Sequence, residues 1–92
     1  MFITYDPNKN RHNIKHRKLS FERVAELDWD NVWINEDERI DYGEVRYTAY
    51  GMLEKRLHFV CFSETEKGIR VISFRKANRR EVKSYEQQII DR

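Results

Sequence analysis

The stretch that decides the fold reads Ile69-Arg70-Val71-Ile72-Ser73-Phe74-Arg75-Lys76-Ala77-Asn78-Arg79-Arg80-Glu81. Its first half is rich in branched and aromatic residues, as strands are, and its second half starts a basic helix that carries Tyr85. A strand interior suits an arginine only where the charge meets water, a carboxylate or a phosphate. Arg70 and Arg75 therefore mark polar contacts on a strand that leads into a C-terminal helix.

The sequence before this helix predicts a sheet built from closely spaced strands. Its three long strands are expected at about 44–53, 56–63 and 68–75. Strands joined by such short connections form an antiparallel meander. A short strand is expected at Phe2–Tyr5, residues 29–34 fit either a strand or an irregular edge, and residues 35–39 form an acidic loop.

Two helices are predicted near the N-terminus. Asp6 is a suitable N-cap and Pro7 a suitable first helical residue, and this helix runs to about His16. Ser20 caps a second helix, and a last helix covers about 77–91. The apolar residues that would turn this last helix toward the sheet are Val82, Tyr85, Ile89 and Ile90. The predicted fold class is α+β, an antiparallel sheet of four or so strands against two N-terminal helices and one C-terminal helix.

The composition indicates one small folded domain spanning residues 1–92. Twelve aromatic residues can supply the burial that folding requires, which argues against disorder. No apolar run approaches the length of a membrane span, and the first residues lack the form of a signal peptide. The single cysteine, Cys61, lies in an apolar run and is interpreted as a core thiol of a cytoplasmic protein.

Charge is distributed unevenly along the chain, although the net charge is only +2. Residues 1–18 hold five Lys and Arg against one Asp, and residues 69–92 hold seven against three acidic residues. Residues 19–68 hold twelve acidic residues against six basic ones. If both cationic ends meet on one surface, that surface attracts phosphates. The alternative is that mixed charges simply solvate a small domain.

The titratable groups favour RNA chemistry without a metal or other cofactor. His12 and His16 share a helical face, but the residues between them offer no carboxylate and basic residues surround them, which disfavours zinc. Cleavage by the 2′-hydroxyl needs a base, an acid and cations that stabilise the phosphorane. The candidate catalytic residues are Lys15, His16, Arg46, Arg70 and Arg75, and the candidate substrate-binding residues are Lys9, Lys76, Arg79 and Tyr85.

Several of these residues also have structural interpretations. His16 could cap the first helix, Arg70 could pair with Glu44 across the sheet, and Tyr85 could belong to the core. Glu81 or Tyr85 could instead orient the cations of the site. Sequence alone leaves the acid and base roles open.

A set of motifs resembles the BrnT family of type II toxins over nearly the whole chain. The motifs are Asp6-x-x-Lys9-x-x-x-Asn13-x-Lys15-His16, Ser20-Phe21-Glu22-x-x-Ala25, Gly43-Glu44-x-Arg46-Tyr47-x-x-x-Gly51 and Arg70-Val71-Ile72-Ser73-x-Arg75-Lys76-Ala77-x-x-x-Glu81-x-x-x-Tyr85. The resemblance implies a fold like that of the RelE toxins and a ribonuclease activity that arrests translation and growth. It also implies an antitoxin of the BrnA type, with a ribbon-helix-helix domain that binds operator DNA.

The implied complex is a heterotetramer with two toxin copies, in which only the antitoxin binds operator DNA. The expected substrate of the toxin is RNA, and no association with a membrane is expected. The chain departs from the family pattern at Arg17, where glycine is usual, and at 63–66, which replaces a Thr-x-Arg motif. If that arginine helps to bind RNA, weaker activity is expected. The alternative function is a non-catalytic basic module that binds a DNA-binding protein or nucleic acid.

Overall fold

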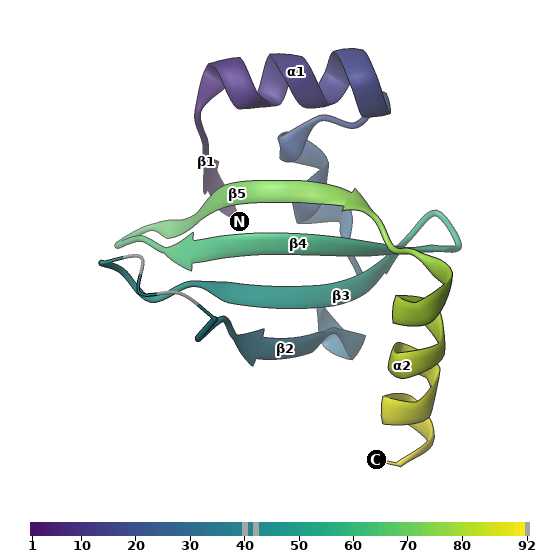
Figure 1. The fold of residues 1–92 in the computed structure, drawn as a ribbon. Helices are drawn as coiled ribbons and strands as arrows, with labels where there is room; N and C mark the ends of the chain where they lie inside the picture. Colours follow the sequence, from purple (N-terminus) through teal and green to yellow (C-terminus); the bar gives the residue numbers. More distant parts are fainter. Residues whose placement is uncertain (40, 42, 92) are drawn as a thin grey trace.

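The computed structural model describes residues 1–39, 41 and 43–91. Its elements in chain order are β1 (Phe2–Thr4), α1 (Pro7–Arg17), the 3-10 helices η1 (Phe21–Glu26) and η2 (Trp29–Asn31), β2 (Trp33–Glu36), β3 (Tyr47–Leu53), β4 (Arg56–Glu64), β5 (Gly68–Lys76) and α2 (Arg79–Ile90). The strands form one sheet in the order β1-β5-β4-β3-β2 (Figure 1). The α+β class and the β3-β4-β5 meander are confirmed.

The five strands agree with the predicted four or so, but the prediction of an antiparallel sheet holds only in part, because the sheet is mixed. β1 runs parallel to β5, with Phe2 opposite Gly68. A Cβ atom on Gly68 would lie 2.0 Å from the carbonyl oxygen of Phe2, so this close approach requires glycine. The partner of a three-residue strand lies far away in sequence, and local patterns carry no information about it.

The second predicted N-terminal helix is not an α-helix. Ser20 caps it as expected, since its hydroxyl accepts a hydrogen bond from the Glu22 amide at 3.2 Å. The backbone then follows the tighter 3-10 geometry of η1, in which Phe21 and Val24, three residues apart, are both buried. The predicted acidic loop also begins too early, because Asn35 and Glu36 belong to β2.

α1 has the predicted start and lies beside the edge of β5 (Figure 1). Asp6 accepts a hydrogen bond from the Asn8 amide, and Lys18 ends the helix in the left-handed conformation with φ 57°. The buried Asn13 amide donates to the carbonyl oxygens of Leu19 at 2.9 Å and Phe74 at 3.0 Å. One side chain therefore ties α1 both to the following turn and to β5.

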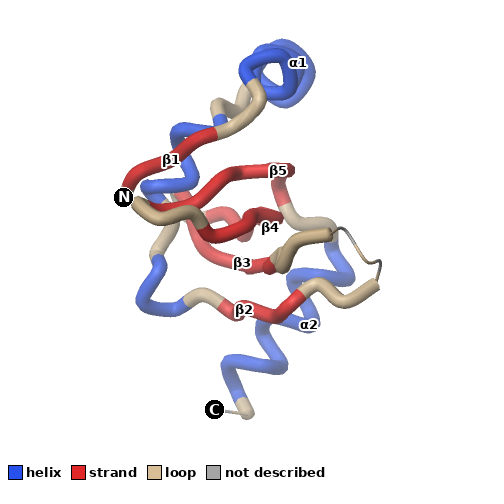
Figure 2. Tube along the Cα trace, turned by 90° about the vertical axis from the view of Figure 1, so that its left-hand side faces the viewer, coloured by secondary structure: helices blue, strands red, loops and turns tan. Residues whose placement is uncertain are grey.

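The hydrophobic core lies on one face of the sheet, between the strands and η1. Its fully buried residues include Val24, Ala49, Val60 and Phe74. Figure 2 shows the 3-10 segments on this side, while α2 and the β2–β3 connection lie on the other. Cys61 is buried as predicted, and burial raises the pKa of its thiol.

α2 packs on the sheet with its first half and projects beyond it with its second (Figure 1). Val82 and Tyr85 are half-buried, and the Tyr85 hydroxyl donates to the Asn31 carbonyl oxygen at 2.9 Å. The prediction that Ile89 and Ile90 face the sheet is wrong, since they are 36% and 74% exposed. Among the described residues, no helix has both the length and the apolar character needed to cross a membrane.

Candidate functional site

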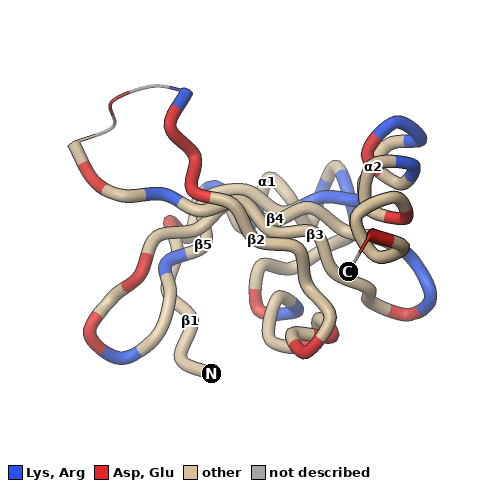
Figure 3. Tube along the Cα trace, turned by 90° about the horizontal axis from the view of Figure 1, so that it is seen from below, with Lys and Arg blue, Asp and Glu red and all other residues tan. Residues whose placement is uncertain are grey.

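The face of the sheet opposite the core carries a pocket of about 300 Å³, which we name the central pocket. It is lined by Glu36, Asp37, Glu38, Arg39, Thr48, Tyr50, Phe59, Arg75 and Glu81. Tyr50, Phe59 and Arg75 form one row across β3, β4 and β5, because each is paired with the next in register. The β2–β3 connection and α2 rise on either side of this row (Figure 3).

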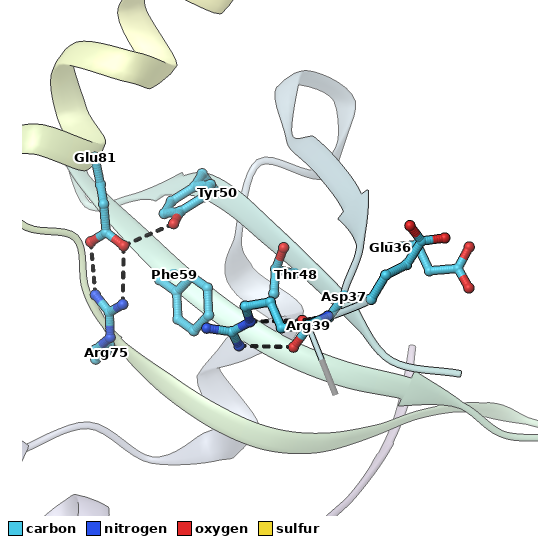
Figure 4. A pocket seen from close by; sticks show the side chains of 9 residues that line it. Glu36, Asp37, Arg39, Thr48, Tyr50, Phe59, Arg75 and Glu81 are labelled. Atoms are coloured by element: carbon cyan, nitrogen blue, oxygen red, sulfur yellow. Dashed lines mark hydrogen bonds and ion pairs between the residues drawn. The ribbon is translucent and has the colours of Figure 1, made fainter. Parts of the chain in front are cut away.

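A carboxylate at the start of α2 holds the arginine of this row. Arg75 donates from Nη1 to Glu81 Oε1 at 2.8 Å and from Nη2 to Glu81 Oε2 at 3.0 Å (Figure 4). Tyr50 donates its hydroxyl to the same carboxylate at 2.8 Å, and the Arg75 guanidinium lies 4.3 Å from the Phe59 ring centroid. Glu81 also closes the capping box of α2 with Asn78. The arginine is thus fixed by paired hydrogen bonds and a cation–π contact.

These contacts move the pKa values of Glu81 and of its second partner, Tyr50, further from neutral pH. Hydrogen bonds from Arg75 lower the pKa of Glu81 to about 2. Burial, with the bond to Glu81, raises the pKa of Tyr50 to about 12. In the free protein neither group readily exchanges a proton near pH 7, so this network positions Arg75 rather than transferring protons.

The depressed pKa of Glu81 predicts a specific acid sensitivity. Stability that depends on the ionised carboxylate is complete above its ordinary pKa of 4.5 and is lost as the pH falls toward about 2. Glu81→Gln is therefore expected to lower the free energy of unfolding by about 1.5–3 kcal/mol at pH 7, and by progressively less below pH 4.5. Urea unfolding at several pH values measures this. Glu86→Gln, at an exposed position of the same helix, is the control, and an equal pH profile for both variants would contradict the prediction.

Arg46, which directly precedes β3, and Arg70 of β5 meet at a second carboxylate. Glu44 Oε1 accepts a hydrogen bond from Arg46 Nε at 3.2 Å and another from Arg70 Nη2. The interpretation of Arg70 as a partner of Glu44 is therefore confirmed. Arg70 is opposite Ser63 on β4, and Phe62 is opposite Tyr47, the residue after Arg46. The two guanidinium groups thus approach from either side of β4.

The imidazoles of α1 line a pocket of about 460 Å³ beside β5, which we name the α1 pocket. Its polar lining includes Lys9, His12, His16, Arg17 and Ser73. The His12 and His16 rings lie in contact, with their centroids 4.1 Å apart and their planes tilted by 41°. Lys15 is also on α1, but its side chain is exposed and it is not among the residues that line this pocket.

Uncompensated positive charge gathers at a third place, where α1 ends near the end of β5. This basic corner, a pocket of about 350 Å³, is lined by Arg17, Lys18, Arg23, Arg56 and Lys76, with Glu54 as its acidic member. Lys76 follows Arg75 in β5, so its side chain points to the opposite face of the sheet. The two cationic ends of the chain therefore meet here, rather than in the central pocket.

The structure divides the predicted site residues among these places. Arg75 lies in the central pocket, Lys9 and His16 in the α1 pocket, and Lys76 in the basic corner. Arg79 is exposed at the start of α2 beside Arg80 and Lys83. Four carboxylates and two arginines line the central pocket, so acidic side chains outnumber basic ones on the face that was predicted to be basic.

Sequence reasoning missed the aromatic floor of the central pocket and the serine that links it to the α1 pocket. Tyr50 and Phe59 alternate with buried residues in their strands, but the sequence gives no signal of this, because both lie in runs of mostly apolar residues. Ser73 lies two residues before Arg75, on the same face of β5, and also lines the α1 pocket. Strand geometry separates the Cα atoms of such residues by about 7 Å.

In the part of the chain that the structure describes, His12 and His16 have no third His, Cys, Asp or Glu beside them that could complete a metal site. Lys9 and Arg17, both cationic, line the same pocket. Within residues 1–39, 41 and 43–91, no three side chains of His, Cys, Asp or Glu are grouped to hold a metal ion.

The structure is that of a small α+β protein with guanidinium groups on one face of its sheet and imidazoles at the edge. The chain belongs to the BrnT family, since the family model described as the ribonuclease toxin BrnT of type II toxin–antitoxin systems matches residues 5–81. This match confirms the resemblance seen in the motifs and implies an antitoxin partner. No curated protein matches the chain.

Proposed function

We propose that this chain is a metal-independent endoribonuclease toxin that cuts RNA and thereby arrests translation and growth. One observation carries the proposal: Arg46, Arg70 and Arg75 lie on the sheet face opposite the core, and the α1 pocket adjoins it through Ser73. Membership of a ribonuclease toxin family supports it. The RelE-like fold and the cytoplasmic location remain predictions.

The proposed reaction is attack of an RNA 2′-hydroxyl on the adjacent phosphate. The O2′–P bond forms as a general base takes the hydroxyl proton, and the P–O5′ bond breaks as a general acid protonates the leaving oxygen. The products are a 2′,3′-cyclic phosphate and a 5′-hydroxyl. Cations must stabilise the charge that develops on the phosphorane oxygens.

The geometry favours separate roles for the two pockets. Histidine is the side chain that ordinarily exchanges protons near neutral pH, which makes His16, with its neighbour His12, the proposed proton carrier. Arg75 is the proposed phosphorane ligand, because its guanidinium has five donors and the described hydrogen bonds use three of them. The remaining two can meet phosphate oxygens.

The RNA strand beyond the reacting phosphate is proposed to follow the basic corner. Arg17 lines both the α1 pocket and this corner, so the two surfaces are continuous. Lys76 contributes there as a predicted substrate contact. Lys15 and Arg79 lie at exposed positions and would contact only more distant phosphates.

The first test is cleavage of RNA by the purified toxin, freed of antitoxin, in excess EDTA. Cutting is expected to continue, because the proposed groups are imidazoles and guanidiniums rather than metal ligands. Gel analysis of a labelled RNA, with chemical identification of the cyclic phosphate end, measures it. Loss of all cutting in chelator, with recovery on adding a divalent ion, would refute the mechanism.

A non-catalytic binding module is the second candidate. The observation that favours it lies in the central pocket, where the pKa of Glu81 is lowered to about 2 and that of Tyr50 is raised to about 12. Neither group is suited to transfer a proton near neutral pH. The His12→Ala/His16→Ala double variant separates the candidates. A toxin should lose cleavage while still binding RNA, whereas a binding module would show no cleavage in either protein.

We propose a BrnA-like antitoxin with a ribbon-helix-helix domain as the partner, with two toxin copies in the complex and operator DNA bound only by the antitoxin. Exposed apolar residues on β2 and the β2–β3 connection, Ile34 and Val45, support a protein partner at this edge of the sheet, where Ile34 lines a pocket with Tyr47 and Phe62. An inhibitor with acidic and apolar residues would match this surface and the α1 cations. Co-expression with the adjacent gene, followed by size-exclusion chromatography, tests the stoichiometry.

A further inference from the structure

We propose that Arg46 and Arg70 form a phosphate-binding subsite, and that Glu44 occupies it in the free protein and leaves when an RNA phosphate binds. The inference rests on the proposed function, and it adds an internal competitor to it. A single carboxylate oxygen, Glu44 Oε1, accepts hydrogen bonds from both guanidiniums. A non-bridging phosphate oxygen is an acceptor of the same charge and would be bound by the same donors.

The sheet explains why two arginines distant in sequence converge. Arg46 directly precedes β3 and its carbonyl oxygen accepts from the Asp37 amide at 2.7 Å, which fixes its backbone. Arg70 is fixed in β5, between β1 and β4. Arg70 therefore extends from a regular strand, and Arg46 from a hydrogen-bonded residue at the start of β3, whereas Glu44 lies two residues earlier, next to Gly43 with φ 72°. One binding donor is held by the sheet and the other by a backbone hydrogen bond beside it, and the competing acceptor comes from the connecting segment.

The contrast with Glu81 identifies Glu44 as the exchangeable carboxylate. Glu81 receives bonds from Arg75, Tyr50 and the backbone of Asn78, and its side chain is 16% exposed. Glu44 receives its bonds from two arginine side chains, and its side chain is 35% exposed. Losing Glu81 would disturb a helix cap, whereas displacing Glu44 only exchanges one anion for another in contact with water.

The exchange has a measurable consequence for affinity. While Glu44 occupies the subsite, RNA must compete with a carboxylate that is attached to the same chain, and its apparent affinity is reduced by the occupied fraction. Glu44→Gln keeps the shape of the side chain but removes its charge. The variant should therefore bind RNA more tightly through Arg46 and Arg70.

The experiment measures binding of a short single-stranded RNA whose 2′-hydroxyls are methylated, so that it presents phosphates without a nucleophile. Fluorescence anisotropy at fixed ionic strength should show about three- to ten-fold tighter binding to Glu44→Gln than to the unaltered chain. Glu86→Gln is the control, because it removes the same charge from an exposed glutamate of α2 that is not among the residues that line the three pockets. In an Arg70→Ala background, Glu44→Gln should bring little gain.

Equal tightening in Glu86→Gln would reduce the effect to net charge and overturn the subsite, and so would weaker binding in Glu44→Gln. Cleavage of unmodified RNA is measured in parallel, so that the two hypotheses fail separately. Tighter binding in Glu44→Gln without any cutting would retain the subsite and reject the endoribonuclease. Cutting by the unaltered chain without tighter binding in Glu44→Gln would do the reverse.

Discussion

Replacing Arg75 by alanine is expected to lower the rate of RNA cleavage about ten- to a hundred-fold and to relieve growth arrest. Arg75 stacks on Phe59 and is held by Glu81, so its remaining donors are preorganised toward the pocket. Losing a charge-assisted contact to the transition state removes about 1.5–3 kcal/mol of stabilisation. Single-turnover cleavage of a labelled RNA gives the rate directly.

Two further variants separate catalysis from stability in this experiment. Arg75→Lys keeps the charge but loses the planar fork, so it should recover stability better than rate. Arg11→Ala removes an exposed arginine of α1 that is bound to Asn8 and is not among the residues that line the three pockets, and it should leave the rate unchanged. Full toxicity of the folded Arg75→Ala variant would contradict the proposed site. Unfolding of both Arg75 variants would assign this arginine a structural role instead.

Local signals in the sequence predicted those elements whose ends are set by their own residues. α1 begins as expected because Asp6 and Pro7 suit the first turn of a helix whatever lies around them. The 3-10 geometry of η1 was not foreseen, because its hydrophobic spacing fits either helix and packing against the sheet decides between them. The parallel pairing of β1 with β5 could not be predicted from local sequence either, because it depends on Gly68, which is distant in sequence.

The sequence indicated which types of residue form the candidate site, but it did not indicate that they are divided among three places on the surface. Arg75 lies in the pocket as a strand arginine should, paired with a carboxylate and an aromatic ring. The pairing of Arg70 with Glu44 was one of two open alternatives, since sequence cannot decide which strands are neighbours. Tyr85 holds α2 to η2 through the Asn31 carbonyl oxygen, which a helical pattern alone cannot distinguish from substrate binding.

Asn13→Asp is expected to be the most destabilising of the proposed changes, by about 3–5 kcal/mol at pH 7. The Asn13 side chain is 7% exposed, and its amide nitrogen donates to the Leu19 and Phe74 carbonyl oxygens. A carboxylate has the same shape but donates no proton, so it would face two acceptors as a buried charge. In a domain of this size, thermal unfolding should shift downward by more than about 10 °C.

The pH dependence of this variant distinguishes lost hydrogen bonds from a change in shape. The pKa of a carboxyl group buried among acceptors rises above its ordinary value of about 3.9, so the deficit should grow as the pH rises above about 4. Below that pH the neutral acid can donate to one of the two carbonyl oxygens, and stability partly recovers. Asn8→Asp, at an exposed position in the first turn of the same helix, is the control and should be neutral or slightly stabilising. A deficit in Asn13→Asp that did not vary with pH would mean that α1 is held on β5 by packing rather than by these two hydrogen bonds.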